Sequence, residues 1–192
     1  IHDPSEAVKL AAVKQNSSSI RHIHEPSEAV QLAAVKRNNH NIQYIRDPSE
    51  AVQLAAVEQN GYSIVYIHEP SEVVKLAAVK QDGSSVVYIR EPSEAVKLAA
   101  VEQNSDNIRH IHEPSEAVQL TAVKRNNHSI QFIYEPSEAV QTQAVINEPA
   151  VLRYIRDPSD AICELAAGLN ATVVKFIKDY EQRERVMEKL KL

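Results

Sequence analysis

The residues best suited to chemistry in this chain are its eight histidines. Two pairs lie two residues apart, His22 with His24 and His110 with His112. A helix brings two imidazoles onto one metal ion when they are four residues apart, and no cysteine or carboxylate pattern completes a site beside either pair. The sequence therefore predicts no metal site.

Catalytic motifs are the next class to consider. The single cysteine, Cys163, stands at a repeat position that otherwise holds Lys or Gln, which predicts an exposed and inert thiol. The chain has no glycine-rich phosphate loop, no nucleophile motif and no acid–base pair outside its repeated pattern. We therefore expect no enzyme activity and no cofactor.

The elements that position these residues follow a period of 22 residues. Prolines mark it at Pro4, Pro26, Pro48, Pro70, Pro92, Pro114, Pro136 and Pro158. A period of this length is typical of stacked repeats, each too small to bury its own apolar face. The sequence predicts an all-α solenoid of eight 22-residue repeats over 1–176, followed by a C-terminal capping helix over 177–192.

Each repeat is expected to hold a long helix and a very short one. In the first repeat we expect Asp3 at the N-cap, Pro4 at the first helical position and Glu6 completing a capping box. The stretch 7–16 has apolar residues at helical spacing, which predicts a helix of about 12 residues. The next six residues have room for one or two turns of α- or 3-10 helix. A β-solenoid is disfavoured because the apolar residues within a repeat recur every 3.6 residues, as in a helix, rather than every second residue, as in a strand.

Two further expectations concern the ends of elements. Gly61 and Gly83 follow their long helices directly, where glycine is the preferred residue just past a helix end. The first repeat has no N-terminal cap, and the chain begins at a repeat boundary. Either the array is trimmed there, or its open face pairs with another chain and forms a homo-oligomer.

Composition limits the partners. The formal net charge is −5, which counts against a dedicated nucleic-acid binder. No apolar run is long enough to span a membrane, and the residues at 1–3 do not begin a signal peptide.

Equivalent residues of a solenoid line up into ladders. The last repeat position forms an aromatic ladder of His22, Tyr44, Tyr66, Tyr88, His110, Phe132, Tyr154 and Phe176. We expect its rings to pack between repeats, the alternative being a stacking surface for bases or a peptide. A cationic ladder of His2, His24, Arg46, His68, Arg90, His112, Tyr134, Arg156 and Lys178 lies beside the acidic residues that precede the prolines. The cationic ladder either compensates the charge of the neighbouring acidic residues or forms a strip that binds an anionic partner surface.

The most variable part of the repeat is the triplet after the long helix, together with repeat positions 9, 14 and 15, numbered as in the first repeat. Variation on one face of a repeat array marks recognition, although drift in a solvated loop would look the same. The candidate partner-binding residues are Lys14, Gln15, Lys36, Arg37, His40, Asn41, Glu58, Tyr62, Lys80, Glu102, Asp106, Lys124, Arg125 and His128.

The stretch Pro48–Ile67, PSEAVQLAAVEQNGYSIVYI, resembles the tandem 22-residue short-helical repeats of phage, bacterial and giant-virus proteins of unknown function. The acidic-Pro-Ser-Glu start, the LAAV run before Asn-Gly and the final Tyr-Ile pair carry the resemblance over about 1–176. It implies an all-α solenoid, similar in architecture to leucine-rich-repeat variants. It also implies a setting in the cytoplasm of a bacterial host, where the protein would bind and inhibit a host or defence protein.

Three functions therefore stand as expectations. The first is a scaffold that binds another protein through the variable residues. The second is binding of nucleic acid or nucleotides along the cationic and aromatic ladders. The third is a designed or purely structural array. The run KRNNH recurs at 36–40 and 124–128, four repeats apart, which indicates duplication of a four-repeat block rather than design from one consensus repeat.

Overall fold

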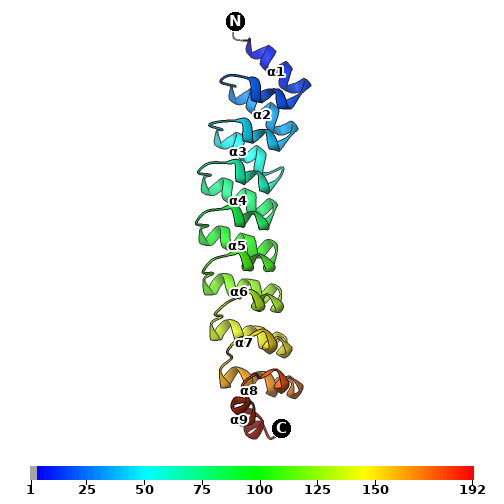
Figure 1. The fold of residues 1–192 in the computed structure, drawn as a ribbon, viewed down its shortest axis with the longest axis vertical. Helices are drawn as coiled ribbons and strands as arrows, with labels where there is room; N and C mark the ends of the chain where they lie inside the picture. The colour runs from blue at the N-terminus through cyan, green and yellow to red at the C-terminus, as the bar shows by residue number, and fades with distance from the viewer. Residues whose placement is uncertain (1–3) are drawn as a thin grey trace. The chain divides into compact units, whose positions relative to one another are not determined.

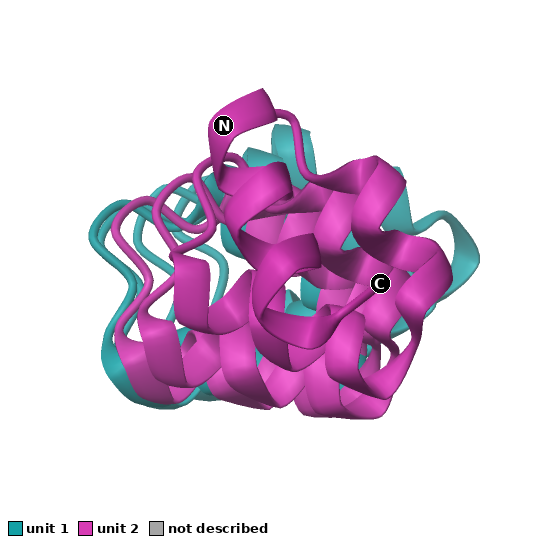
Figure 2. Ribbon diagram, turned by 90° about the horizontal axis from the view of Figure 1, so that it is seen from below, with its two compact units in different colours: residues 1–103 teal, residues 104–192 magenta. Residues whose placement is uncertain are grey.

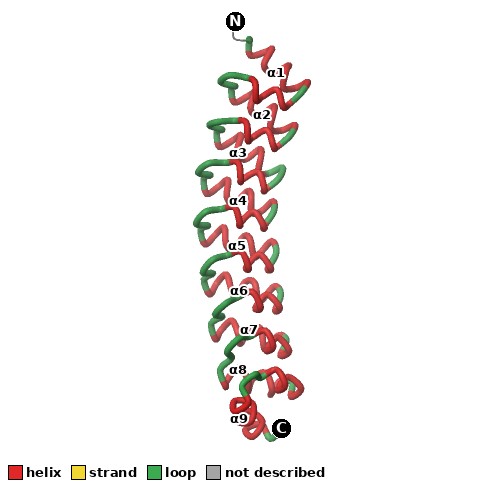
Figure 3. Tube along the Cα trace, viewed as in Figure 1, coloured by secondary structure: helices red, strands yellow, loops and turns green. Residues whose placement is uncertain are grey.

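The computed structural model describes residues 4–192, in which every regular element is a helix (Figure 3). The fold is the predicted all-α repeat solenoid. The long helices are α1 (Glu6–Gln15), α2 (Glu28–Arg37), α3 (Glu50–Val57), α4 (Glu72–Gln81), α5 (Glu94–Gln103), α6 (Glu116–Arg125), α7 (Glu138–Asn147) and α8 (Asp160–Leu169). Each is followed by a 3-10 helix: η1 (Ser17–His22), η2 (Asn39–Tyr44), η3 (Gly61–Tyr66), η4 (Gly83–Tyr88), η5 (Ser105–His110), η6 (Asn127–Phe132), η7 (Pro149–Tyr154) and η8 (Ala171–Phe176). A last helix, α9 (Tyr180–Leu190), ends the chain.

The chain divides into two compact units, unit 1 over 1–103 and unit 2 over 104–192 (Figure 2). In unit 1, the helices α1, α2, α3, α4 and α5 pack in sequence, each against its neighbour, and η1 to η4 pack against one another in the same order (Figure 1). In unit 2, α6, α7, α8 and α9 pack in sequence, beside η5 to η8. Among the described residues, no helix is both long and apolar enough to cross a membrane.

Stacking of repeats creates the core. Val30, Ala34 and Val35 of α2 are all fully buried. Val8 occupies the repeat position of Val30 in α1, the first helix, yet it is 57% exposed. The preceding repeat therefore buries this position in the later helices. Full burial of a valine contributes about 1.5–3 kcal/mol relative to exposure, so contact between repeats adds stability at this position.

The prediction for the helix start was wrong by two residues. Ser27 is the N-cap of α2, and its hydroxyl accepts a hydrogen bond from the Val30 amide at 3.3 Å. The short side chain of serine reaches that amide well, which leaves the preceding proline and acidic residue outside the helix. The Ser27 hydroxyl also donates to the carboxylate of Glu6 in the repeat before, so this glutamate links two repeats. Asp3, the predicted cap of α1, lies outside the described residues, as do Ile1 and His2.

The acidic residue before proline has an unusual backbone in several repeats. The φ angles of Glu25, Glu69, Glu91 and Glu113 are +46°, +50°, +52° and +47°. This left-handed region disfavours residues with a Cβ by roughly 1–2 kcal/mol.

A polar residue precedes the 3-10 helix of each repeat, asparagine in most repeats but Asp82 before η4 and Glu148 before η7. Asn38 ends α2, and its side-chain oxygen accepts from the His40 amide at 3.0 Å, which caps η2. The long helices consequently span ten residues, or eight in α3, rather than about 12. The second element is a six-residue 3-10 helix in each repeat, one of the two forms expected.

The glycines have a different role from the predicted one. Gly61 and Gly83 are buried, each begins a 3-10 helix, and no described glycine has a positive φ. A Cβ added to Gly61 would lie 2.4 Å from the carbonyl oxygen of Ala78 and 2.6 Å from the hydroxyl oxygen of Ser85. Close approach of the next repeat therefore explains this glycine.

The prediction of an exposed Cys163 was also wrong. Its side chain is fully buried in α8, the helix against which α9 packs. Burial, with smaller contributions from the charges of Asp160 and Glu164, raises the pKa of the thiol to about 11. Because the thiolate is the reactive form, burial and the raised pKa both lower the expected reactivity of Cys163.

Candidate interaction face

The exposed side of the 3-10 helices gathers the side chains best placed to meet a partner. In each six-residue helix the second, fifth and sixth residues are exposed or half-buried, whereas the fourth is buried. We call the second, fifth and sixth positions of η1–η4 the η face of unit 1 and those of η5–η8 the η face of unit 2. The η face of unit 1 comprises Ser18, Arg21, His22, His40, Gln43, Tyr44, Tyr62, Val65, Tyr66, Ser84, Val87 and Tyr88. That of unit 2 comprises Asp106, Arg109, His110, His128, Gln131, Phe132, Ala150, Arg153, Tyr154, Thr172, Lys175 and Phe176.

Tyrosines interlock at the centre of the η face of unit 1. The ring of Tyr62 meets Tyr88 of the next repeat edge-to-face, with centroids 5.0 Å apart, and meets Tyr66 in the same manner at 6.2 Å. Rings of the aromatic ladder thus contact neighbouring repeats, as expected, yet Tyr66 and Tyr88 stay 37% and 46% exposed. Val65 and Val87 beside them are 42% and 50% exposed. The result is an apolar, aromatic surface on three consecutive repeats.

Cations stacked on rings characterise the η face of unit 2. The Arg109 guanidinium lies over the Phe132 ring, with Cζ 4.1 Å from the centroid. Two repeats later, Arg153 lies over Phe176 at 4.9 Å. Lys175 places its ammonium 5.3 Å from the centroid of the same Phe176 ring. Stacking of this kind holds a guanidinium in place while its N–H edge stays available.

Four of the residues predicted from sequence lie on these faces, namely His40, Tyr62, Asp106 and His128. His128 has an acidic neighbour, since its Nε2 lies 3.1 Å from Glu148. Asn41 is buried and donates to the Ala34 carbonyl at 3.0 Å, so it does not belong to an exposed face. The 3-10 geometry turns the third triplet residue toward the core from the second repeat onward.

The predicted residues at repeat positions 14 and 15 lie at the C-terminal ends of the long helices and are exposed: Lys14, Gln15, Lys36, Arg37, Glu58, Lys80, Glu102, Lys124 and Arg125. Two glutamines at position 15 reach neighbouring repeats. Gln59 donates to the Val35 carbonyl at 3.2 Å, and the Gly61 amide donates to Gln81 at 2.6 Å. In these repeats position 15 serves the stacking rather than an exposed site.

Repeat position 9 is structural, contrary to its expected place in the recognition face. Its side chains are buried or half-buried. Gln31, Gln53, Gln119 and Gln141 each donate to the proline carbonyl of their own repeat at 2.9 Å. The amide thus fastens the connector to the start of the long helix.

The fifth position of the 3-10 helix was missed in the sequence analysis. Val65, Val87, Arg109 and Arg153 occupy it, and across the eight repeats it holds Val, Arg, Gln or Lys. It lies three residues after the central triplet residue, the spacing that places two side chains on one face of a 3-10 helix. Those two signals together would have identified it.

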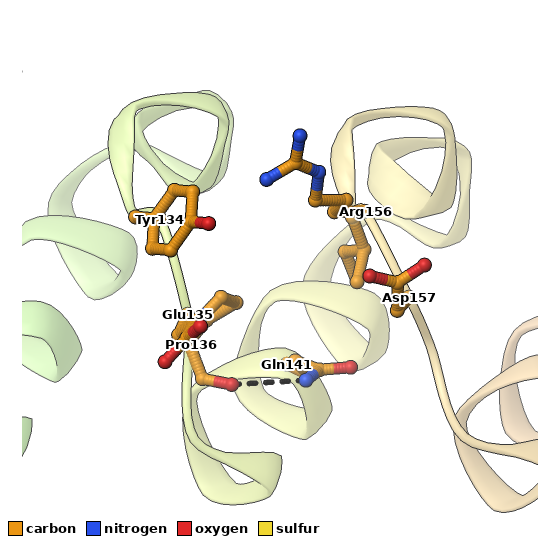
Figure 4. Close-up of a pocket in the computed structure, with 7 residues that line it drawn as sticks. Tyr134, Glu135, Pro136, Gln141, Arg156 and Asp157 are labelled. Atoms are coloured by element: carbon orange, nitrogen blue, oxygen red, sulfur yellow. Dashed lines mark hydrogen bonds between the residues drawn. The ribbon is translucent and has the colours of Figure 1, made fainter.

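Grooves lie between successive connectors in unit 2. One of about 270 Å³ lies between the Tyr134 and Arg156 connectors, with Gln141 at its base (Figure 4). Arg156 lies over the Tyr134 ring at 5.3 Å, so the two ladder residues contact each other across the groove. A second groove of about 520 Å³ lies one repeat earlier. Within residues 4–192, no group of three or more His, Cys, Asp and Glu residues could hold a metal ion.

Comparison with known proteins gave no match: no family model, curated protein or solved structure matches the chain. The resemblance to the 22-residue short-helical repeats stays a prediction carried by the residues themselves.

Proposed function

We propose that this protein is an interaction scaffold that binds a partner protein through the η face of unit 1. The observation that carries the proposal is the exposed cluster of Tyr44, Tyr62, Val65, Tyr66, Val87 and Tyr88 on η2, η3 and η4. Exposed apolar patches of several neighbouring side chains mark interaction sites in soluble proteins, and tyrosine is enriched where binding energy concentrates.

Comparison of repeats supports a binding role over a packing role for these residues. The position of Val65 and Val87 holds Gln43 in η2 and Arg109 in η5. The backbone of the repeat therefore accepts a polar side chain there. Exposed valines in two consecutive repeats do not serve the stacking, which favours a binding surface over a purely structural array.

The same face favours a protein over a nucleic acid. The exposed positions of η2, η3 and η4 carry neither Lys nor Arg, whereas nucleic-acid sites depend on cations that neutralise phosphates. The tyrosines also contact one another edge-to-face, so part of each ring is engaged within the protein.

The test compares two variants in capture of partners from bacterial lysate, with and without nuclease. The η variant carries Tyr62→Ser, Val65→Gln, Val87→Gln and Tyr88→His, residues that other repeats use at these positions. The control variant exchanges charges at the long-helix ends, Lys36→Glu with Glu58→Lys, again residues that other repeats use. Circular dichroism verifies that both melt like the parent.

We expect one stoichiometric protein with the parent and the control variant, resistant to nuclease, and its loss with the η variant. Retention of the partner by the η variant would contradict the proposal. Loss with the control variant alone would move the site to repeat positions 14 and 15. Recovery of nucleic acid, with proteins lost on nuclease treatment, would favour nucleic-acid binding along the cationic and aromatic ladders.

A further inference from the structure

Repeat 5 contains an arginine whose charge is satisfied within the repeat. Arg109 donates through Nε to the backbone carbonyl of Asp106 at 2.9 Å and through Nη2 to the Asp106 carboxylate at 3.1 Å. Its guanidinium is stacked on Phe132 of the next repeat. The arrangement is an ion pair built on an aromatic ring, and it belongs entirely to the η face of unit 2.

Repeat 7 reproduces this arrangement with the carboxylate left out. Arg153 donates through Nε to the backbone carbonyl of Ala150 at 3.0 Å and stacks on Phe176, the equivalents of Asp106 and Phe132 two repeats on. Alanine replaces aspartate, so the guanidinium edge has no acid beside it. In the described part of unit 2, no carboxylate lies within ion-pair distance of Arg153.

A second cation adds to the positive charge at this place. Lys175 lies near the ring of Phe176 that already carries Arg153, and both cations are exposed. Two like charges beside one ring repel each other unless an anion lies between them. In repeat 5 the second donor to the aspartate is Ser129 at 3.4 Å, whereas its equivalent in repeat 8 is the buried Val173. Lys175 instead brings a second exposed donor near the ring of Phe176.

We propose that Arg153 and Lys175, set on Phe176, form a binding site for a carboxylate in an acidic segment of the partner protein. This rests on the proposed protein-binding function and names the chemistry of one part of the partner. The chain itself indicates a carboxylate, because Asp106 occupies the equivalent position on Arg109. Guanidinium and carboxylate match in a planar, two-point geometry. Base stacking is disfavoured because Arg153 already covers Phe176.

The test uses the full chain and a fluorescein-labelled hexaglutamate peptide, followed by fluorescence anisotropy at about 20 mM salt, where exposed charges are weakly screened. We expect binding by the parent, and about threefold to fivefold weaker binding by Arg153→Gln, as for loss of an exposed ion pair. Ala150→Asp gives repeat 7 the carboxylate that Asp106 provides in repeat 5. This internal acid would occupy Arg153, so the variant should bind the peptide more weakly, to a similar extent. Ala150→Asn has nearly the same shape without the charge and should bind like the parent.

The reciprocal change tests the same idea in the opposite direction. Asp106→Asn frees Arg109 and should strengthen hexaglutamate binding by about twofold to threefold. Equal binding by Ala150→Asp and Ala150→Asn, or no binding by the parent, would overturn the proposal. Tighter binding of an oligothymidylate of equal charge, with loss on Arg153→Gln, would assign the site to nucleic acid instead.

Failure here leaves the proposed function separately testable. The four substitutions of the η variant lie in unit 1 and report on the apolar patch, whereas the Arg153 and Ala150 substitutions lie in unit 2. Partner loss with the η variant, combined with no effect of Arg153→Gln on hexaglutamate, would retain the scaffold and remove only the carboxylate site.

Discussion

The side-chain amide of Gln182 donates to the backbone carbonyl of Pro158 at 2.9 Å. In repeat 7 the equivalent bond is internal, from Gln141 to Pro136, also at 2.9 Å (Figure 4). Repeat 8 carries Cys163 where repeat 7 carries Gln141, and a thiol is a poor donor. Helix α9 therefore supplies from outside a hydrogen bond that Gln141 makes within its own repeat, which gives the capping role of α9 a residue-level basis.

Gln182→Ala should loosen this cap. We expect a loss of about 1–2 kcal/mol in the free energy of unfolding, because the Pro158 carbonyl and the Asp160 carboxylate each lose a donor. Alkylation of Cys163 by iodoacetamide should accelerate, since the buried thiol reacts only when α9 opens. Glu181→Ala, an exposed change on the same helix, is the control. Identical alkylation rates in the parent and Gln182→Ala would contradict the role of the cap.

Val52→Asp should unfold much of unit 1. Val52 is fully buried in α3, and an unpaired buried charge costs about 3 kcal/mol or more. Val8→Asp is the matched control at the same repeat position, where 57% exposure should limit the loss to less than about 1 kcal/mol. Thermal melts followed by helical circular dichroism distinguish the two. Similar melting temperatures would show that stacking does not bury this position.

Gly61→Ala should destabilise the contact between repeats 3 and 4. The added Cβ would meet the backbone carbonyl of Ala78, which cannot move without shifting α4, and we expect a loss of about 1–3 kcal/mol. Gly168→Ala is the opposite case, because a Cβ added there in α8 would meet no atom within 4 Å beyond its chain neighbours and the backbone of its own helix. Alanine favours the helix there by about 0.5–1 kcal/mol. Urea unfolding of both variants should give a lower free energy of unfolding for Gly61→Ala and a higher one for Gly168→Ala than for the parent.

The ion pair between Arg185 and Asp160 should make the docking of α9 sensitive to acid. Hydrogen bonds from Arg185 and then Gln182 hold the pKa of Asp160 below its ordinary value of 3.8. A lowered folded pKa contributes stability above 3.8, and this stability is lost as the pH falls through the folded pKa. The difference in melting temperature between the parent and Arg185→Gln should therefore be full at neutral pH and shrink in acid.

Arg183→Gln is the control for this pH dependence. Arg183 donates to the Ile177 carbonyl at 3.1 Å, which does not titrate. Its effect on the melting temperature should stay constant between neutral and acidic pH. A constant effect of Arg185→Gln as well would show that Asp160 does not mediate the docking.

Local patterns predicted the elements well and their boundaries less well. The proline period and the apolar spacing of 3.6 indicated repeated long helices, and the short distance to the next proline limited the second element to a turn or two. The helix start was misplaced because the Asp-Pro-Ser-Glu motif offers two side-chain caps within three residues. In the structure the serine is the N-cap whether or not the acidic residue has a positive φ, as Ser71 after Glu69 and Ser49 after Asp47 show.

The candidate site was only half accessible to sequence reasoning. Variation among repeats identified His40, Tyr62, Asp106 and His128, which do lie on the exposed 3-10 faces. It could not separate them from Asn41, because adjacent residues of a 3-10 helix point in different directions and the turn between the helices sets which one is buried.

The sequence by itself determined what one repeat contains: a long helix, a short helix and the residues that vary between copies. This information is local, since propensity, capping and periodicity depend on neighbours a few residues apart. The tertiary structure decided which residues of different repeats meet, such as Arg153 with Phe176 and Gly61 with Ala78. These contacts depend on the rotation and spacing of stacked helices, which arise from packing and are not encoded in the distance along the chain.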